Sequence, residues 1–246
     1  MQTRIGLAII LLSLSAWSQT KPATTTPPRR TLAPAASAEP TAIIDTTAGK
    51  IHCTLFPKQA PIGVDNFIGL ASGTKDWTSP ATHQKKHGVP LYDGTIFHRV
   101  IPEFMIQGGD PTGTGMGDPG YKFKNETSPD LTFDRPGRLA YANAGADTNG
   151  SQFFITEKAL TGEQATMLNG HYTIFGQCDD ASVELVKQLA RMARDPRNDR
   201  PFRPIKITHI RIQKAGAPAT AAKPASTAPK RPTVAKPAAP KTAPPS

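Results

Sequence analysis

The stretch FHRVIPEFMIQGGD, residues 97–110, carries the strongest indication of how this chain folds. Residues 95–101 are rich in β-branched and aromatic side chains, and a second apolar run follows at 104–107, so two short strands are predicted. The Gly- and Pro-rich segment 108–120 that comes next must be a loop. The pattern indicates short strands joined by irregular connections.

Short strand signals recur on both sides of this stretch. Residues 42–55 predict a hairpin, whose second half alternates apolar and polar side chains like a half-buried strand. Further strands are expected at 139–142, 152–156, 172–175 and 205–212. Helical spacing is found twice, between Pro61 and Gly73 and at 183–192. Many short strands with only two helices favour an antiparallel barrel or sandwich.

The basic charge of the chain lies mostly outside its middle. The 246 residues carry a formal net charge of +10 and 25 prolines. Segment 214–246 holds six Lys and Arg residues, no acid and eight prolines, and segment 19–40 holds five more prolines with a net charge of +2. The middle is therefore almost neutral, and its charge gives no reason to expect a nucleic-acid partner.

The N-terminus reads as an export signal peptide, residues 1–18. Arg4 is followed by a mostly apolar run, 5–16, which is too short to span a bilayer comfortably, and the small residues Ala16 and Ser18 predict cleavage after Ser18. A retained anchor is the alternative. Because no other segment is apolar enough to cross a membrane, we expect an exported protein, in the periplasm rather than the medium.

Two segments with little apolar bulk flank the middle. The linker 19–40 is rich in Thr and Pro, and the tail 214–246 is almost entirely Ala, Pro, Lys and Thr. Such compositions cannot offset the entropy of ordering, so both segments are predicted to be disordered. The tail is interpreted as a solubilising tether, with adhesion of its lysines to an anionic envelope surface as the alternative.

Only two cysteines are present, Cys53 and Cys178. An exported chain could pair them, but both lie in apolar strand-like segments where Cys also packs well as a small hydrophobe, so the pairing stays open. The G-x-G-x-x-G pattern at 115–120 lacks the following helix of a nucleotide site, and His83 and His87 have no third ligand nearby. We expect no metal and no cofactor.

Three sequence blocks follow one another through the middle of the chain. Residues 97–110 are followed by LAYANAG at 139–145 with TNGSQFFIT at 148–156, and then by LNG at 168–170 with TIFG at 173–176. Together they closely resemble the cyclophilin family of peptidyl-prolyl cis/trans isomerases, over essentially all of residues 41–213. The resemblance implies a mainly β domain, a closed eight-stranded antiparallel β-barrel capped by two α-helices, with the active groove on its outer face.

The resemblance also places the family's site on this sequence. The catalytic arginine falls on Arg99, and Gln107 is its polar partner. The positions implied for the substrate groove are Phe104, Met105, Ala142, Asn143, Gln152, Phe154, Met167 and Tyr172. Among them, Phe104, Met105 and Phe154 correspond to the apolar floor that receives the proline ring.

Two of these positions depart from many eukaryotic members of the family. Met167 stands where those members have Trp, and Tyr172 stands where they have His. Met167 keeps the wall apolar but lacks the indole N–H donor, which predicts weak cyclosporin binding. Tyr172 keeps an aromatic edge, so isomerase activity should survive. The polar segment 74–90 is read as a loop that either shapes access to the groove or is a harmless insertion.

The residue types suit this chemistry on physical grounds. Rotation about an X–Pro bond is opposed by about 18–20 kcal/mol of amide resonance. An apolar pocket can hold the ring, and a guanidinium near the prolyl nitrogen can hydrogen-bond a lone pair that is available only when the amide is twisted. We therefore expect a monomeric isomerase that acts on proline-containing polypeptides and helps exported proteins to fold.

Other interpretations of the same residues remain open. Phe104, Met105 and Phe154 could be ordinary core residues, and Arg99 could form a surface ion pair. The groove could also clamp proline peptides without catalysis. Arg99 separates an isomerase from a clamp, because a clamp needs the apolar pocket and not the cation.

Overall fold

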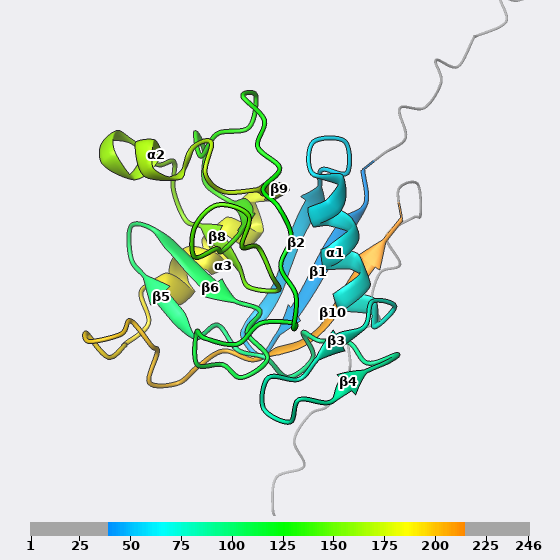
Figure 1. Cartoon of the computed structure of the whole chain (residues 1–246). Helices are drawn as coiled ribbons and strands as arrows, with labels where there is room; N and C mark the ends of the chain where they lie inside the picture. Colours follow the sequence, from blue (N-terminus) through cyan, green and yellow to red (C-terminus); the bar gives the residue numbers. More distant parts are fainter. Residues whose placement is uncertain (1–38, 215–246) are drawn as a thin grey trace, which may run out of the picture. The chain divides into compact units, whose positions relative to one another are not determined.

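The computed structural model describes residues 39–214 (Figure 1). The predicted signal peptide, nearly all of the predicted linker and all but the first residue of the predicted tail lie outside this range. Within it, the elements are β1 (Thr41–Thr46), β2 (Gly49–Leu55), α1 (Pro61–Ser72), β3 (Trp77–Thr78), β4 (Lys85–Lys86), β5 (Arg99–Ile101), β6 (Met105–Gly108), β7 (Arg138–Tyr141), β8 (Phe153–Thr156), α2 (Gly162–Leu168), β9 (Ile174–Cys178), α3 (Asp180–Ala190) and β10 (Ile207–Gln213).

Eight of these strands form one antiparallel sheet, which confirms the predicted eight-stranded antiparallel architecture. The strand order is β10-β1-β2-β9-β7-β8-β6-β5. The sheet curls into a half-barrel, so the expectation of a fully closed barrel was overstated. No ladder joins its end strands β5 and β10 within the described residues, and Ile96 and Lys206, which lie just outside these strands, form an isolated bridge. Pro201 and Pro204 lie just before β10 and lack the N–H groups that a longer ladder would need.

Both predicted helices are present, and each has a recognisable boundary. Pro61 occupies the first turn of α1, and Gly73 ends it with a left-handed φ of 75°. Asp179 caps α3 by accepting a hydrogen bond from the Ser182 amide at 2.8 Å. The α1 helix lies beside β10, whereas α3 lies beside β2 and β6 (Figure 1). None of the helices in residues 39–214 has the length and apolarity of a bilayer span.

The third helix, α2, was missed from the sequence. It has seven residues, and only Leu168 among them is buried. A helix this short with one buried side chain shows no periodic apolar stripe, which is the signal that sequence reasoning relies on. It projects from the body of the molecule at the upper left of Figure 1.

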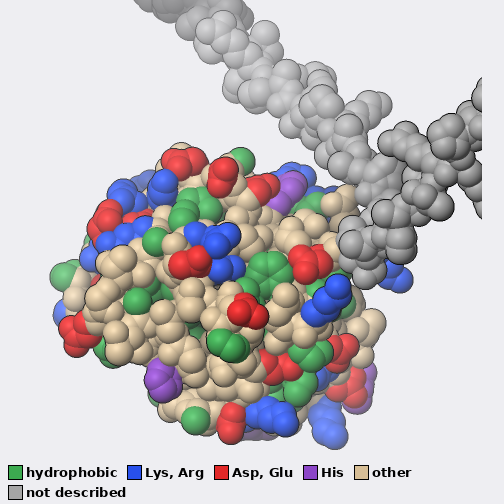
Figure 2. Space-filling view, turned by 90° about the horizontal axis from the view of Figure 1, so that it is seen from above, with side chains coloured by type: hydrophobic (Ala, Val, Ile, Leu, Met, Phe, Trp, Pro, Cys, Tyr) green, Lys and Arg blue, Asp and Glu red, His purple; other side chains and the backbone are tan. Residues whose placement is uncertain are grey.

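The segment 74–90, predicted as a loop, contains the two-residue strands β3 and β4. They pair Trp77 with Lys86, and the Trp77 indole donates to the Val89 carbonyl at 2.9 Å. His87 forms an ion pair with Asp76 at 2.8 Å. Acidic and basic side chains are interspersed over the face of the molecule shown in Figure 2, in keeping with the near-neutral middle inferred from the sequence.

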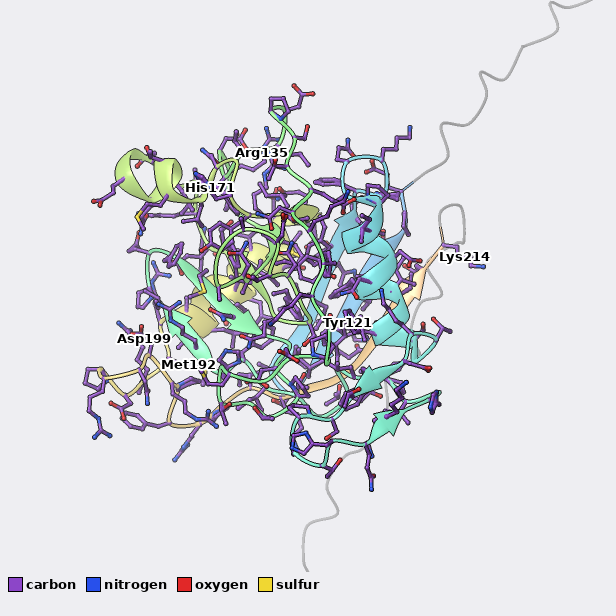
Figure 3. The ribbon with its side chains drawn as sticks, in the orientation of Figure 1. Tyr121, Arg135, His171, Met192, Asp199 and Lys214 are labelled. Carbon is purple, nitrogen blue, oxygen red and sulfur yellow. A yellow bond between two sulfur atoms is a disulfide. The ribbon has the colours of Figure 1, made fainter. Side chains whose placement is uncertain are left out.

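Every residue of strands β7 and β8 is buried, and Figure 3 shows side chains crowded around the middle of the domain. Successive side chains of a strand point to opposite faces. Phe153 therefore joins the main core, where its ring lies 5.6 Å from that of Phe67, while Phe154 joins a second apolar cluster. This second cluster, with Met105, Phe133 and Ala140 among its members, underlies the candidate site.

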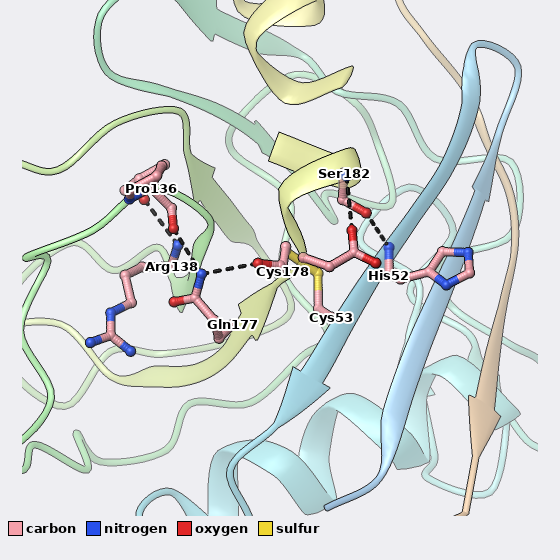
Figure 4. The surroundings of a disulfide bond; sticks show 9 residues. His52, Cys53, Pro136, Arg138, Gln177, Cys178 and Ser182 are labelled. Carbon is pink, nitrogen blue, oxygen red and sulfur yellow. Dashed lines mark hydrogen bonds between the residues drawn. A yellow bond between two sulfur atoms is a disulfide. The ribbon is translucent and has the colours of Figure 1, made fainter. Parts of the chain in front are cut away.

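The structure resolves the question of the cysteines, because Cys53 on β2 is bonded to Cys178 on β9 (Figure 4). The two residues lie opposite each other in the antiparallel pair and are both buried. Ser182 at the start of α3 accepts a hydrogen bond from the His52 amide at 2.7 Å. The disulfide therefore sits where β2, β9 and α3 meet.

Candidate active site

A cavity of about 310 Å³ opens on the outer face of the sheet. Its lining consists of Arg99, Phe104, Met105, Gln107, Ala142, Asn143, Phe154, Met167, Leu168 and Tyr172. Nine of the ten residues implied by the resemblance are thus brought together, and Leu168 is an addition. Gln152 lines a neighbouring hollow of about 220 Å³, which shares Gln107, Ala142 and Asn143 with the first.

The strand register explains why polar and apolar halves of the site adjoin. Arg99 on β5 lies opposite Gln107 on β6, and Gln107 lies opposite Phe154 on β8. The row continues to Ala140 on β7. Because directly opposed residues of a sheet share a face, the cation, the amide and the aromatic ring are neighbours in space.

The apolar half of the cavity, called the proline pocket below, is formed by Phe104, Met105, Phe154 and Tyr172. Met105 and Phe154 are 2% and 4% exposed, so they belong to the second cluster and also form the cavity floor. The Phe154 ring stacks on Phe133 at 5.7 Å and meets Tyr172 edge-on at 5.8 Å. Packing on two sides holds this ring in place.

The outer wall of the cavity is much more open than its floor. Met167 is 62% exposed, although it lines the cavity together with Leu168. Met167 therefore presents an apolar side chain to solvent at the rim.

Phe133 supports the floor from below but was not singled out in the sequence, because an isolated Phe in the segment after 120 belongs to no motif.

A chain of amide hydrogen bonds leads from the backbone to Arg99. Gln152 donates through Nε2 to the carbonyls of Gly115 and Gly117 at 3.0 and 2.9 Å, so its oxygen faces Gln107. Gln107 donates through Nε2 to that oxygen at 2.9 Å. The Gln107 Oε1 is thereby left to accept from Arg99 Nη1, at the long distance of 3.5 Å. The predicted pairing of Gln107 with Arg99 is present, and Gln152 orients it.

A buried carboxylate organises the loop that carries Gly115 and Gly117. Asp110 accepts hydrogen bonds from the Thr112 amide at 2.7 Å, the Gly115 amide at 2.6 Å and the Gly117 amide at 3.1 Å. Burial alone would raise the pKa of Asp110, but these hydrogen bonds and one from the Thr112 hydroxyl outweigh it and hold the pKa below its usual value. The glycines of the G-x-G-x-x-G pattern serve this loop, since a Cβ at Gly117 would lie 2.1 Å from Asp110 Oδ1.

A third hollow, of about 210 Å³, lies on another side of Arg99. His98, Thr114, Asn198 and Arg200 contribute to its lining. Burial lowers the pKa of His98, and the Arg200 and Arg99 cations lower it further, although Asp110 opposes them. His98 is therefore neutral at pH 7, whereas the Arg99 cation lines both this hollow and the cavity that holds the proline pocket.

The edge of the groove is held by Ala142 and Asn143, which follow β7. The Ala142 amide donates to the Gln152 carbonyl at 2.9 Å, and Asn143 Nδ2 donates to the His171 carbonyl at 3.1 Å. These contacts fix a stretch of backbone beside the proline pocket. A pocket for an apolar ring, next to a fixed cation and an extended backbone edge, defines a site for proline-containing peptides and a protein of the prolyl isomerase class.

The chain belongs to the cyclophilin-type peptidyl-prolyl cis-trans isomerase family, whose model matches residues 41–212. Among curated proteins, peptidyl-prolyl cis-trans isomerase A of Mycobacterium tuberculosis is 51% identical over 173 residues, which are 70% of this chain and 91% of the relative. Peptidyl-prolyl cis-trans isomerase B of Streptomyces anulatus is 46% identical over 70% of this chain and 95% of the relative. The chain is therefore a peptidyl-prolyl cis-trans isomerase.

Solved structures support the same assignment. A cyclophilin-type peptidyl-prolyl cis-trans isomerase of Cryptosporidium parvum is 35% identical and superposes with a TM-score of 0.58, covering 71% of this chain and 97% of that one. The Cryptosporidium protein has also been solved in the presence of the dipeptide Ala-Pro, with the same identity and TM-score.

Proposed function

We propose that this isomerase accelerates X–Pro rotation in exported proteins, with Arg99 as its catalytic cation. The observation that carries the proposal is the row Arg99–Gln107–Phe154, which sets a guanidinium beside the floor of the proline pocket. The Ala-Pro dipeptide used with the Cryptosporidium relative is the kind of ligand that this pocket suits.

In the proposed mechanism, the protein breaks no bond and moves no proton. The proline pocket holds the ring while the rest of the peptide rotates about the X–Pro bond. As the amide twists, its nitrogen regains a lone pair, and Arg99 donates a hydrogen bond to it. This interaction exists only in the twisted state, so it lowers the barrier rather than merely tightening binding. One charge-assisted hydrogen bond, worth about 1.5–3 kcal/mol, accounts for about one to two factors of ten.

Gln107 and Gln152 act on the cation and not on the substrate nitrogen. Their amides link Arg99 to the loop built on Asp110, so the guanidinium is held before substrate arrives. Pre-positioning matters because reorienting a donor during the reaction would consume the free energy that its hydrogen bond supplies. Ala142 and Asn143 line the same cavity, where they would border the backbone of the bound peptide.

Assistance to exported proteins is supported by the N-terminal sequence and by the disulfide. Disulfides persist in oxidising compartments and are rare in reducing ones, so the Cys53–Cys178 bond favours the periplasm over the cytosol. The expected mature N-terminus is Gln19. Cell fractionation with mass spectrometry of the recovered protein tests both the compartment and the cleavage after Ser18. Recovery from the cytosol with residues 1–18 attached would contradict it.

The catalytic role is tested in a protease-free assay of X–Pro isomerisation. Arg99→Ala should remove most of the rate enhancement while leaving the affinity for a proline peptide nearly unchanged. Arg203→Ala is the matched control, because Arg203 is exposed and lines neither the proline pocket nor the adjoining hollow. A proline-peptide clamp without catalysis predicts instead that the wild type binds the peptide with no rate enhancement.

A further inference from the structure

The Arg99 guanidinium has a second partner besides Gln107. Its Nε lies 3.6 Å from Oδ2 of Asp199, while its Nη1 faces Gln107 Oε1 at 3.5 Å. The two contacts use different nitrogens, and within residues 39–214 this guanidinium forms no other hydrogen bond or ion pair. Figure 3 labels Asp199 on the loop that passes beside β5.

The backbone of Asp199 is attached to the same strand that carries Arg99. The Val100 amide donates to the Asp199 carbonyl at 2.9 Å. The Asp199 amide in turn donates to the Asp195 carbonyl at 2.9 Å, which closes a tight turn. Two consecutive β5 residues thus contact Asp199, one through its carbonyl and one through its carboxylate.

The second carboxylate oxygen is held as well. Arg194 donates through Nε to Asp199 Oδ1 at 3.1 Å. Asp199 is only partly exposed, at 27% of its side chain, whereas the Arg99 side chain is 42% exposed. A long side chain with that much exposure has many rotamers open to it unless its partners restrict them.

The backbone of Asp199 adopts an unfavourable conformation. Its φ of +59° lies in the left-handed region, which disfavours residues with a Cβ and is the usual place for glycine. Such residues persist where the surroundings hold them, and they cluster at functional sites. Asp is one of the few residues with a Cβ that enter this region, so the conformation agrees with a carboxylate at this position, although Gly would serve the turn alone at least as well.

We infer that Asp199 is a positioning residue, which holds the Arg99 guanidinium over the proline pocket through Nε while Gln107 holds it through Nη1. The inference rests on the proposed catalytic role of Arg99. A long contact to a neutral amide is a weak restraint by itself, and a carboxylate fixed by Arg194 supplies the second point of attachment. Asp199 contacts the cation and lies outside the lining of the proline pocket.

The test compares Asp199→Asn and Asp199→Gly in the full chain. Both should lower kcat/KM by roughly fivefold or more, through kcat, with peptide affinity unchanged, because the donor is displaced and the pocket is intact. Asp199→Gly should nevertheless unfold close to the wild-type temperature, since glycine accepts the left-handed turn and this gain offsets the lost contacts with Arg99 and Arg194. A purely structural residue would show loss of stability together with loss of activity.

A double-mutant cycle makes the role specific to Arg99. In an Arg99→Ala background, Asp199→Asn should cause no further loss of rate. Asp93→Asn is the control. The Asp93 carboxylate pairs with His209 at a distance of 3.0 Å, and Asp93 is not among the residues that line the cavity. The NMR signal of the Arg99 Nε–H group should shift in Asp199→Asn and stay in place in the control.

The outcomes separate the two proposals. If Arg99→Ala retains full activity, the proposed catalytic role fails. The positioning role of Asp199 is overturned by either of two results. In the first, Arg99→Ala is inactive but both Asp199 variants turn over like the wild type. In the second, the loss of rate in an Asp199 variant adds to the loss in Arg99→Ala when the two substitutions are combined.

Discussion

Replacing Asp110 by Asn is the most informative perturbation of the loop that positions Arg99, the proposed catalytic cation. The carboxylate is fully buried, and its Oδ2 accepts from the amides of Gly115 and Gly117. An Asn can keep one acceptor for Thr112, but its NH₂ group then faces two backbone donors. Each buried donor left without a partner costs about 1–3 kcal/mol, so Asp110→Asn should lower the free energy of unfolding by about 2–6 kcal/mol.

Activity should fall with stability, because the same loop holds Gln152. The carbonyls of Gly115 and Gly117 orient the Gln152 amide, which orients Gln107 and hence Arg99. We expect kcat/KM to drop roughly tenfold even at temperatures where the variant is folded. Urea unfolding followed by circular dichroism, and the isomerisation assay on the same samples, give the two quantities.

Acid titration adds an independent signature. The pKa of Asp110 is lowered on folding, so its stabilisation is fully present above the unfolded value of about 3.9 and is lost as pH falls through the lower folded pKa. The Asn variant lacks this contribution and should have a flatter stability curve below about pH 4. Asp118→Asn, in the same loop but partly exposed and paired with Lys122, should change stability by less than about 1 kcal/mol. An Asp110→Asn protein as stable and as active as the wild type would contradict the role assigned to this carboxylate.

Three further perturbations test other parts of the structure. Replacing Cys53 and Cys178 by Ser should lower the free energy of unfolding by up to about 5 kcal/mol, because the disulfide closes a loop with a sequence separation of 125. The kcat/KM of the folded enzyme should stay unchanged. Chemical denaturation measures the stability, and the isomerisation assay measures kcat/KM. Phe154→Ala should destabilise the protein by about 3–5 kcal/mol in chemical denaturation and should raise KM in steady-state kinetics. An unchanged KM would argue against a place for Phe154 in the proline pocket. Met167→Trp adds an N–H donor at an exposed position and should tighten cyclosporin binding roughly tenfold by calorimetry; equal affinity would mean that this donor is not what limits binding.

Local sequence patterns predicted the strand-rich architecture and the two long helices, whereas the resemblance of three sequence blocks to the cyclophilin family implied the family and nine of the ten cavity-lining residues. Period-2 alternation marks the strand β2, Pro61 and Gly73 bound α1, and the blocks at 97–110 and 139–156 carry site residues only a few positions apart. Such signals can be read from a linear sequence because the interactions that produce them span a few residues.

The meeting of distant segments, by contrast, became visible only in the folded domain. Folding pairs Cys53 with Cys178, leaves the sheet a half-barrel, places Asp110 under the loop that orients Gln152, and brings Asp199 to Arg99 from far along the chain. None of these contacts repeats with a strand or helix period. Each depends on where irregular loops return to the sheet, and that geometry is set by the packing of the whole domain.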